Sequence, residues 1–77
     1  MKEADFDIAR ERLREHIALN NKRNTPEREA VLRAAYSLPS RFTLEELEDT
    51  LPEIYDFPVS RATVYNSLRL FVGLGLM

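Results

Sequence analysis

Residues 60–71 combine side chains that bind nucleic acids with the spacing of an amphipathic helix. The run reads Ser60-Arg61-Ala62-Thr63-Val64-Tyr65-Asn66-Ser67-Leu68-Arg69-Leu70-Phe71. Val64, Leu68 and Phe71 recur at steps of four and three, so we expect them to form one packing stripe. The opposite face carries no acidic residue and consists of Arg61, Ala62, Asn66 and Arg69, with Thr63 and Tyr65 at its edges. Such a face suits a helix in the major groove of DNA, but the same pattern also fits an ordinary helix with a solvated outer surface.

The composition argues against catalysis and against metal binding by this chain alone. The chain has 77 residues, no cysteine and a single histidine, His16. A chain of this length buries only about 60% of its unfolded surface when it folds, which leaves no room for two hydrophobic cores. We therefore expect residues 1–77 to form a single domain. It has no thiolate and only one imidazole for a metal site. No nucleophile–base–acid set or phosphate-binding glycine loop is present, so the sequence predicts a protein that is not an enzyme and binds no cofactor itself.

The net charge of −2 hides an uneven distribution of charges. Residues 45–56 hold six of the thirteen acidic residues and no Lys or Arg, which leaves seven acidic and eleven basic residues elsewhere. Nucleic acid is therefore not excluded as a partner. No apolar run approaches the roughly 20 residues of a membrane span, and the charged N-terminus does not resemble a signal peptide. We expect a cytoplasmic protein without a membrane partner.

Apolar periodicity predicts two helices in the first half of the chain. The first runs from about Asp5 to Leu19. The second begins at Thr25-Pro26, where threonine can cap and proline suits the first helical position, and it ends at Pro39.

Two further helices are predicted in the second half. Thr43-Leu44-Glu45-Glu46 fits a capping box, and Pro52 is expected to break the third helix near Leu51. The fourth begins at Ser60 as its N-cap and ends by Gly73 or Gly75. Two capped helices joined by a short linker indicate a helix-turn-helix, in which the second helix reads base edges.

Two blocks of the sequence carry a resemblance to a known family. Arg23-Asn24-Thr25-Pro26-Glu27-Arg28-Glu29-Ala30-Val31-Leu32 is similar to the pattern R-x-T-P-x-R-x-x-I-L, and Ala62-Thr63-Val64-Tyr65-Asn66-Ser67-Leu68 is similar to A-T-V-Y-[RN]-x-L. Phe71 and Gly75-Leu76 follow the second block, and Thr43-Leu44-Glu45-Glu46-Leu47 lies between the two. Over about residues 10–77 the chain resembles the ferric uptake regulator (Fur) family of bacterial metal- and peroxide-responsive repressors.

The resemblance implies a fold and a division of labour. It implies a mainly α, winged helix-turn-helix domain of four helices, with the wing hairpin missing or only begun at the C-terminus. It also implies that the C-terminal domain, which dimerises and binds iron, zinc or manganese in full-length members, is absent from this chain. A homodimer is then expected only through that missing domain. Arg41 stands where many members place a metal-binding histidine, and arginine cannot take that role.

The resemblance further implies double-stranded DNA as the partner and assigns candidate contacts. Tyr65 matches a tyrosine that packs on thymine methyl groups, and Asn66 is expected at a base edge or a phosphate. Ser60, Arg61, Thr63 and Arg69 are candidates for phosphate contacts. Lys22 and Arg23 are expected to reach the neighbouring minor groove or backbone.

A competing interpretation is a winged-helix module used for protein–protein contact. Its interface would consist of the acidic third helix together with the apolar residues Leu70, Val72 and Leu76.

Overall fold

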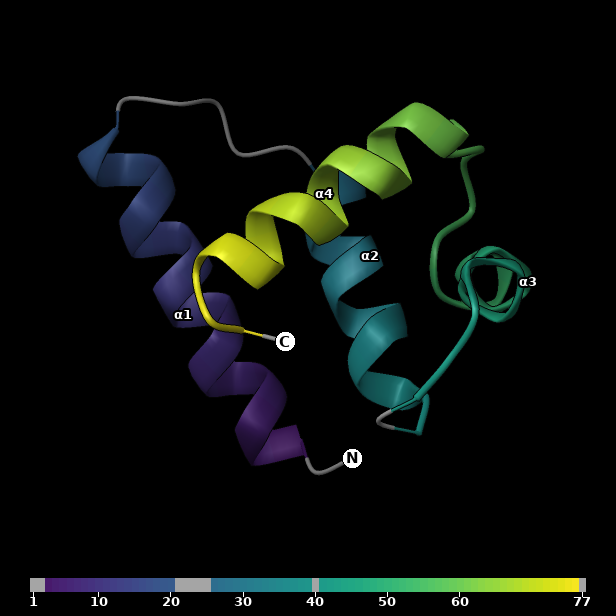
Figure 1. The fold of residues 1–77 in the computed structure, drawn as a ribbon, viewed down its shortest axis with the longest axis horizontal. Coiled ribbons are helices and arrows are strands. Elements are labelled where there is room, and N and C mark those ends of the chain that lie inside the picture. Colours follow the sequence, from purple (N-terminus) through teal and green to yellow (C-terminus); the bar gives the residue numbers. More distant parts are fainter. Residues whose placement is uncertain (1–2, 21–25, 40, 77) are drawn as a thin grey trace.

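The computed structural model describes residues 3–20, 26–39 and 41–76, and this part of the chain forms four helices (Figure 1). They are α1 (Glu3–Leu19), α2 (Pro26–Ser37), α3 (Leu44–Ile54) and α4 (Arg61–Gly73). Helices α1 and α3 lie at opposite ends of the long axis, and α2 and α4 cross between them (Figure 1). The expectation of a mainly α fold is confirmed. The described residues contain no strand, so the wing remains a prediction.

Helix α2 is the centre of the core, because it packs against each of the other three helices. Its buried residues are Ala30, Val31, Leu32, Ala34 and Ala35. Three of these five are alanines, whose small side chains let neighbouring backbones approach closely. The predicted start at Pro26 is confirmed, whereas its expected cap, Thr25, lies outside the described residues. The helix ends two residues before Pro39, as the sequence predicts.

The capping box at the start of α3 is confirmed. The Thr43 hydroxyl accepts a hydrogen bond from the Glu46 N–H at 3.1 Å, and the Glu46 carboxylate accepts one from the Thr43 N–H at 2.8 Å. Two backbone donors at the helix start thereby gain partners within the chain.

The predicted break of α3 at Pro52 is wrong. The helix continues through Pro52 to Ile54, and the Tyr55 N–H still donates to the Leu51 carbonyl at 2.8 Å. Proline lacks an N–H, so it removes the one helical bond to the Glu48 carbonyl. Near a helix end this loss is small compared with the packing of Leu51 and Ile54 on the core.

The C-terminus of α4 is closed by a glycine, as predicted. Gly75 has φ of +73°, a left-handed conformation that glycine adopts readily. The Leu76 N–H donates to the Phe71 carbonyl at 2.9 Å and the Gly75 N–H donates to the Val72 carbonyl at 3.1 Å, the pair of bonds that defines a Schellman motif. The turn brings Leu76 into the core, where its carbonyl accepts a hydrogen bond from the Tyr36 hydroxyl. The pKa of Tyr36 is raised, mainly because its phenol is partly buried and secondly because the negative charge of Asp5 is nearby.

Candidate nucleic-acid interface

The N-terminus of α4 is set by Ser60, which is its N-cap as predicted. Ser60 has extended backbone angles (φ −68°, ψ 152°), and its hydroxyl accepts a hydrogen bond from the Thr63 N–H at 3.2 Å. The Ser60 and Thr63 hydroxyl oxygens are also hydrogen-bonded to each other, at 2.9 Å. Both hydroxyls expected to bind phosphate are therefore already engaged within the first turn.

The inner face of α4 differs in part from the predicted stripe. Val64 and Phe71 are buried as expected, but the third buried residue is Ser67, which is 2% exposed. Leu68 is only half-buried and packs at the edge of the core. Ser67 lies three residues after Val64 and four before Phe71, so it sits on the helical line that joins them.

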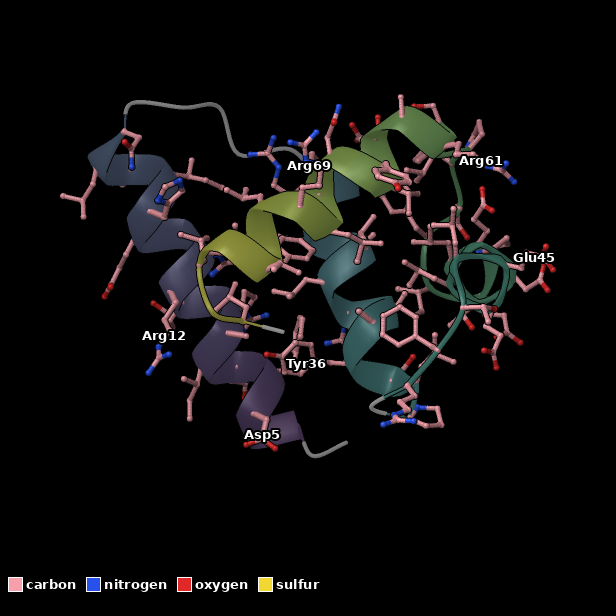
Figure 2. The ribbon with its side chains drawn as sticks, viewed as in Figure 1. Asp5, Arg12, Tyr36, Glu45, Arg61 and Arg69 are labelled. Atoms are coloured by element: carbon pink, nitrogen blue, oxygen red, sulfur yellow. The ribbon has the colours of Figure 1, made fainter. Side chains whose placement is uncertain are left out.

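The outer face of α4 presents Tyr65, Asn66 and Arg69 to solvent, with Tyr65 58% exposed. Within the described part of the chain, the side chains of these three residues make no hydrogen bond or ion pair. Arg69 lies near the middle of the helix and Arg61 at its N-terminal end (Figure 2). The helix contains no acidic residue. This face therefore holds an aromatic ring, an amide and a guanidinium with unused hydrogen-bonding capacity.

Arg61 also lies on the surface of α4, but it is paired with α3. Its Nε atom donates to Oε2 of Glu48 at 3.2 Å, and its Nη2 atom donates to Oε1 at 3.0 Å. These bonds, and then the charges of Glu48 and Glu45, raise the pKa of Arg61. Figure 2 shows Arg61 at the end of α4 that faces α3, where Glu45 lies. The guanidinium is thus matched in charge by α3.

An apolar groove of about 560 Å³ runs beside the outer face of α4. Its lining comes from the start of α3 and from α4: Phe42, Leu44, Tyr65, Leu68, Arg69, Val72 and Gly73. Tyr65 and Arg69 thus belong to both the outer face and the groove. An apolar surface beside a cation is compatible with contact to base edges, where the thymine methyl is the apolar group.

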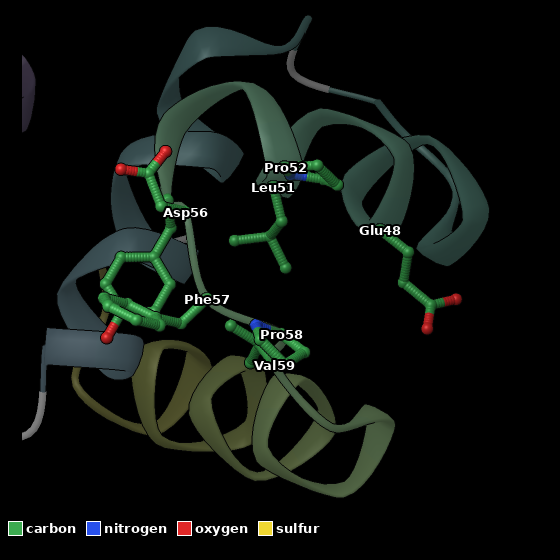
Figure 3. A pocket seen from close by; sticks show the side chains of 8 residues that line it. Glu48, Leu51, Pro52, Asp56, Phe57, Pro58 and Val59 are labelled. Carbon is green, nitrogen blue, oxygen red and sulfur yellow. The ribbon is translucent and has the colours of Figure 1, made fainter.

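A second groove of about 510 Å³ lies between the C-terminal half of α3 and the linker to α4 (Figure 3). Leu51 points toward Pro58 and Val59 across this groove (Figure 3). Its lining includes the carboxylates of Glu48 and Asp56 but no cation. This groove therefore does not suit a phosphate backbone.

Of the basic residues considered outside α4, the structure describes Arg41 but not Lys22 and Arg23. Lys22 and Arg23 lie outside the described residues, and Arg41 is exposed. In the described part of the chain, no three residues among His, Asp and Glu are grouped so that they could hold a metal ion. The same part contains no helix long and apolar enough to cross a membrane.

The apolar interface of the competing interpretation is mostly absent from the surface. Leu76 is 7% exposed and Leu70 is half-buried, so of the three expected residues Val72 alone is strongly exposed. The reason is the turn at Gly75, which directs Leu76 into the core.

Glu48 was not predicted from the sequence as a partner of Arg61. The two residues are thirteen positions apart, and this spacing along the chain does not indicate a contact.

Comparison with known proteins finds similarity to repressors. The peroxide-responsive repressor PerR of Staphylococcus aureus strains USA300, COL and MW2 is 41% identical to this chain over 56 residues. The match covers 71% of this chain and 36% of each relative, so the chain spans about a third of the length of these relatives. No family model matches the chain. No solved structure matches it closely.

Proposed function

We propose that this chain is the DNA-binding domain of a bacterial transcriptional repressor of the Fur family, and that α4 reads double-stranded operator DNA. The observation that carries the proposal is the outer face of α4, where Tyr65, Asn66 and Arg69 are exposed with no partner among the described residues. The similarity to PerR, a repressor of that family, supports it. A protein with this role acts in the cytoplasm.

The proposal gives each exposed side chain a role. Tyr65 makes apolar contact with thymine methyl groups, and Asn66 donates to or accepts from a base edge or a phosphate. Arg69 contacts the phosphate backbone and so sets the register of the helix in the groove. Ser60, Arg61 and Thr63 stand at the N-terminal end of α4, where the proposal places the phosphate backbone, although their side chains are hydrogen-bonded within the chain. A contact of Lys22 and Arg23, which lie outside the described residues, with the adjacent backbone or minor groove is proposed as well.

Metal sensing and stable dimerisation are proposed to lie outside these 77 residues. This proposal rests on the composition, since the chain offers one histidine and no cysteine to a transition metal. The apolar residues Leu70, Leu74 and Leu76 also offer little surface for self-association, because Leu76 is buried and Leu70 and Leu74 are half-buried; Met77 lies outside the described residues. We therefore expect a monomer or a weakly associating species, which sedimentation equilibrium measures.

Fluorescence anisotropy tests the DNA proposal. The probe is a labelled duplex recovered from a random-sequence library by repeated selection with the unmodified chain. We compare Arg69→Gln with Arg12→Gln, since both remove one exposed positive charge but Arg12 lies on α1, away from α4 (Figure 2). Each phosphate contact contributes about 0.9 to the slope of log K against log salt.

We expect Arg69→Gln to lower that slope by about 0.9 and Arg12→Gln to leave it unchanged. Equal effects of the two substitutions would show that α4 is not the contact surface. If no duplex is recovered by selection, and a generic duplex is not bound at 50 mM salt either, the chain is not a DNA-binding domain.

A further inference from the structure

Glu48 of α3 holds Arg61 in the arrangement that a phosphate would otherwise take. A carboxylate and a phosphate both offer two oxygens to the donor fork of a guanidinium. The two bonds, at 3.2 Å and 3.0 Å, use the Nε and Nη2 atoms of Arg61. The Arg61 side chain is 70% exposed and that of Glu48 27% exposed, so the guanidinium is the more accessible partner of the pair.

The two hydroxyls in the first turn of α4 are also hydrogen-bonded internally. The Ser60 and Thr63 hydroxyls are hydrogen-bonded to each other, and the Thr63 N–H donates to Ser60. The charge of Glu45 also acts on Arg61. Arg61 is therefore paired with a carboxylate, in contrast to Arg69, which makes no ion pair within the described residues.

We propose that Glu48 is an intramolecular competitor of DNA phosphate for Arg61, so that Arg61 adds little to DNA affinity while the Glu48 carboxylate is present. This inference rests on the proposed DNA-binding function. It assigns Glu48 a role in weakening the hold of the domain on any DNA backbone. The consequence is that removing this negative charge strengthens binding.

A cycle of variants tests the competition in the full chain with the selected duplex. Glu48→Gln keeps the size of the side chain and one acceptor oxygen but removes the charge. We expect it to raise affinity and to steepen the salt slope by about 0.9, one additional phosphate. The ratio of the DNA affinity of Glu48→Gln to that of the unmodified chain should then be about 3.5-fold larger at 50 mM salt than at 200 mM salt.

Two further variants isolate the role of the pair. Arg61→Gln should leave the slope of the unmodified chain almost unchanged, and Glu48→Gln should not steepen the slope when Arg61 is also replaced. Asp49→Asn is the matched control, because it removes an exposed charge from α3 at a residue with no contact to Arg61. We expect no steeper slope from it. Circular dichroism melts check that each variant is folded.

The outcomes separate the two proposals. If the unmodified chain binds DNA but Glu48→Gln weakens binding, Glu48 positions Arg61 for a phosphate and the competition is refuted. If Arg61→Gln alone lowers the slope by about 0.9, Arg61 already contacts a phosphate and the competition is again refuted. If the unmodified chain shows no salt-dependent binding to any duplex, the DNA-binding function itself fails.

Discussion

Helices α3 and α4 are alike in how they form and opposite in what they present. Each begins at a hydroxyl residue whose side chain accepts from a backbone N–H three positions later, and each buries a few residues against α2. On the outside, α3 carries five acidic residues and no basic one, whereas α4 carries two arginines and no acidic one. Capping and burial thus explain why both segments are helices. The two helices differ in their outward residues and hence in the sign of the charge that they present.

The largest expected effects come from the inner faces, where the two helices should behave alike. Leu47 in α3 and Phe71 in α4 are both 0% exposed. We expect Leu47→Ala to cost about 2–5 kcal/mol and Phe71→Ala about 3–5 kcal/mol in the free energy of unfolding, through lost burial and a residual cavity. Urea unfolding followed by circular dichroism measures both, with the exposed Glu53→Ala as control. A cost below about 1 kcal/mol at either site would contradict the shared role of the inner faces.

Substitutions on the outer faces should separate the two helices. If α4 reads DNA as proposed, Tyr65→Ala and Asn66→Ala should each weaken binding to the selected duplex by about 1–3 kcal/mol, because each removes a proposed base contact. Asp49→Ala on α3 should not weaken binding. Anisotropy titrations and thermal melts of the three variants check this. If Tyr65→Ala instead destabilises the fold as much as Phe71→Ala and leaves affinity per folded molecule unchanged, Tyr65 is a packing residue.

The ends of the two helices differ, since α4 closes through a glycine in the left-handed region and α3 ends at Tyr55 in an extended conformation. Gly75→Ala should cost about 1–2 kcal/mol of stability, because a Cβ atom is strained at φ of +73°. Gly73→Ala is the matched control. It has negative φ and open space around a Cβ atom, so we expect it to be neutral or to stabilise by about 0.4–1 kcal/mol. Chemical denaturation measures the free energy of unfolding of both variants. Equal losses of stability in the two would contradict a left-handed turn at Gly75.

The smallest expected effects come from the two N-cap hydroxyls, each of which accepts a hydrogen bond from the backbone N–H three positions later. Thr43→Ala and Ser60→Ala should each lower stability by about 1 kcal/mol, because each removes the acceptor for one backbone N–H at the helix start. Melting temperatures of the two variants, measured side by side, test this. A difference of more than about 1 kcal/mol between the two costs would show that the two hydroxyls do not contribute alike to helix stability.

The features that could be predicted from the sequence depend on near neighbours in the chain. Caps at Thr43 and Ser60 and the stop at Gly75 depend on residues within about five positions, and amphipathic periodicity placed the four helices within a few residues of their bounds. The outward placement of Asn66 and Arg69 followed from the same periodicity.

The features that could not be predicted depend on tertiary packing. A serine is usually placed outside, but Ser67 is buried because α4 faces α2 along the line from Val64 to Phe71. Pro52 stays within α3 because packing of the last turn outweighs one lost hydrogen bond. The bond between Arg61 and Glu48 depends on how α3 and α4 are oriented, which spacing along the chain does not specify.

The central position of α2 sets the order in which parts of the domain open to solvent. Helix α1 packs chiefly on α2, whereas α2 packs on three helices. Amide hydrogens exchange with solvent through openings whose free energy reflects the packing that must be undone. We therefore expect α1 to separate by breaking one main interface, and α2 to become accessible only when the other three helices have separated from it. Exchange of the α2 amides should therefore report global stability, and exchange of the α1 amides should be faster.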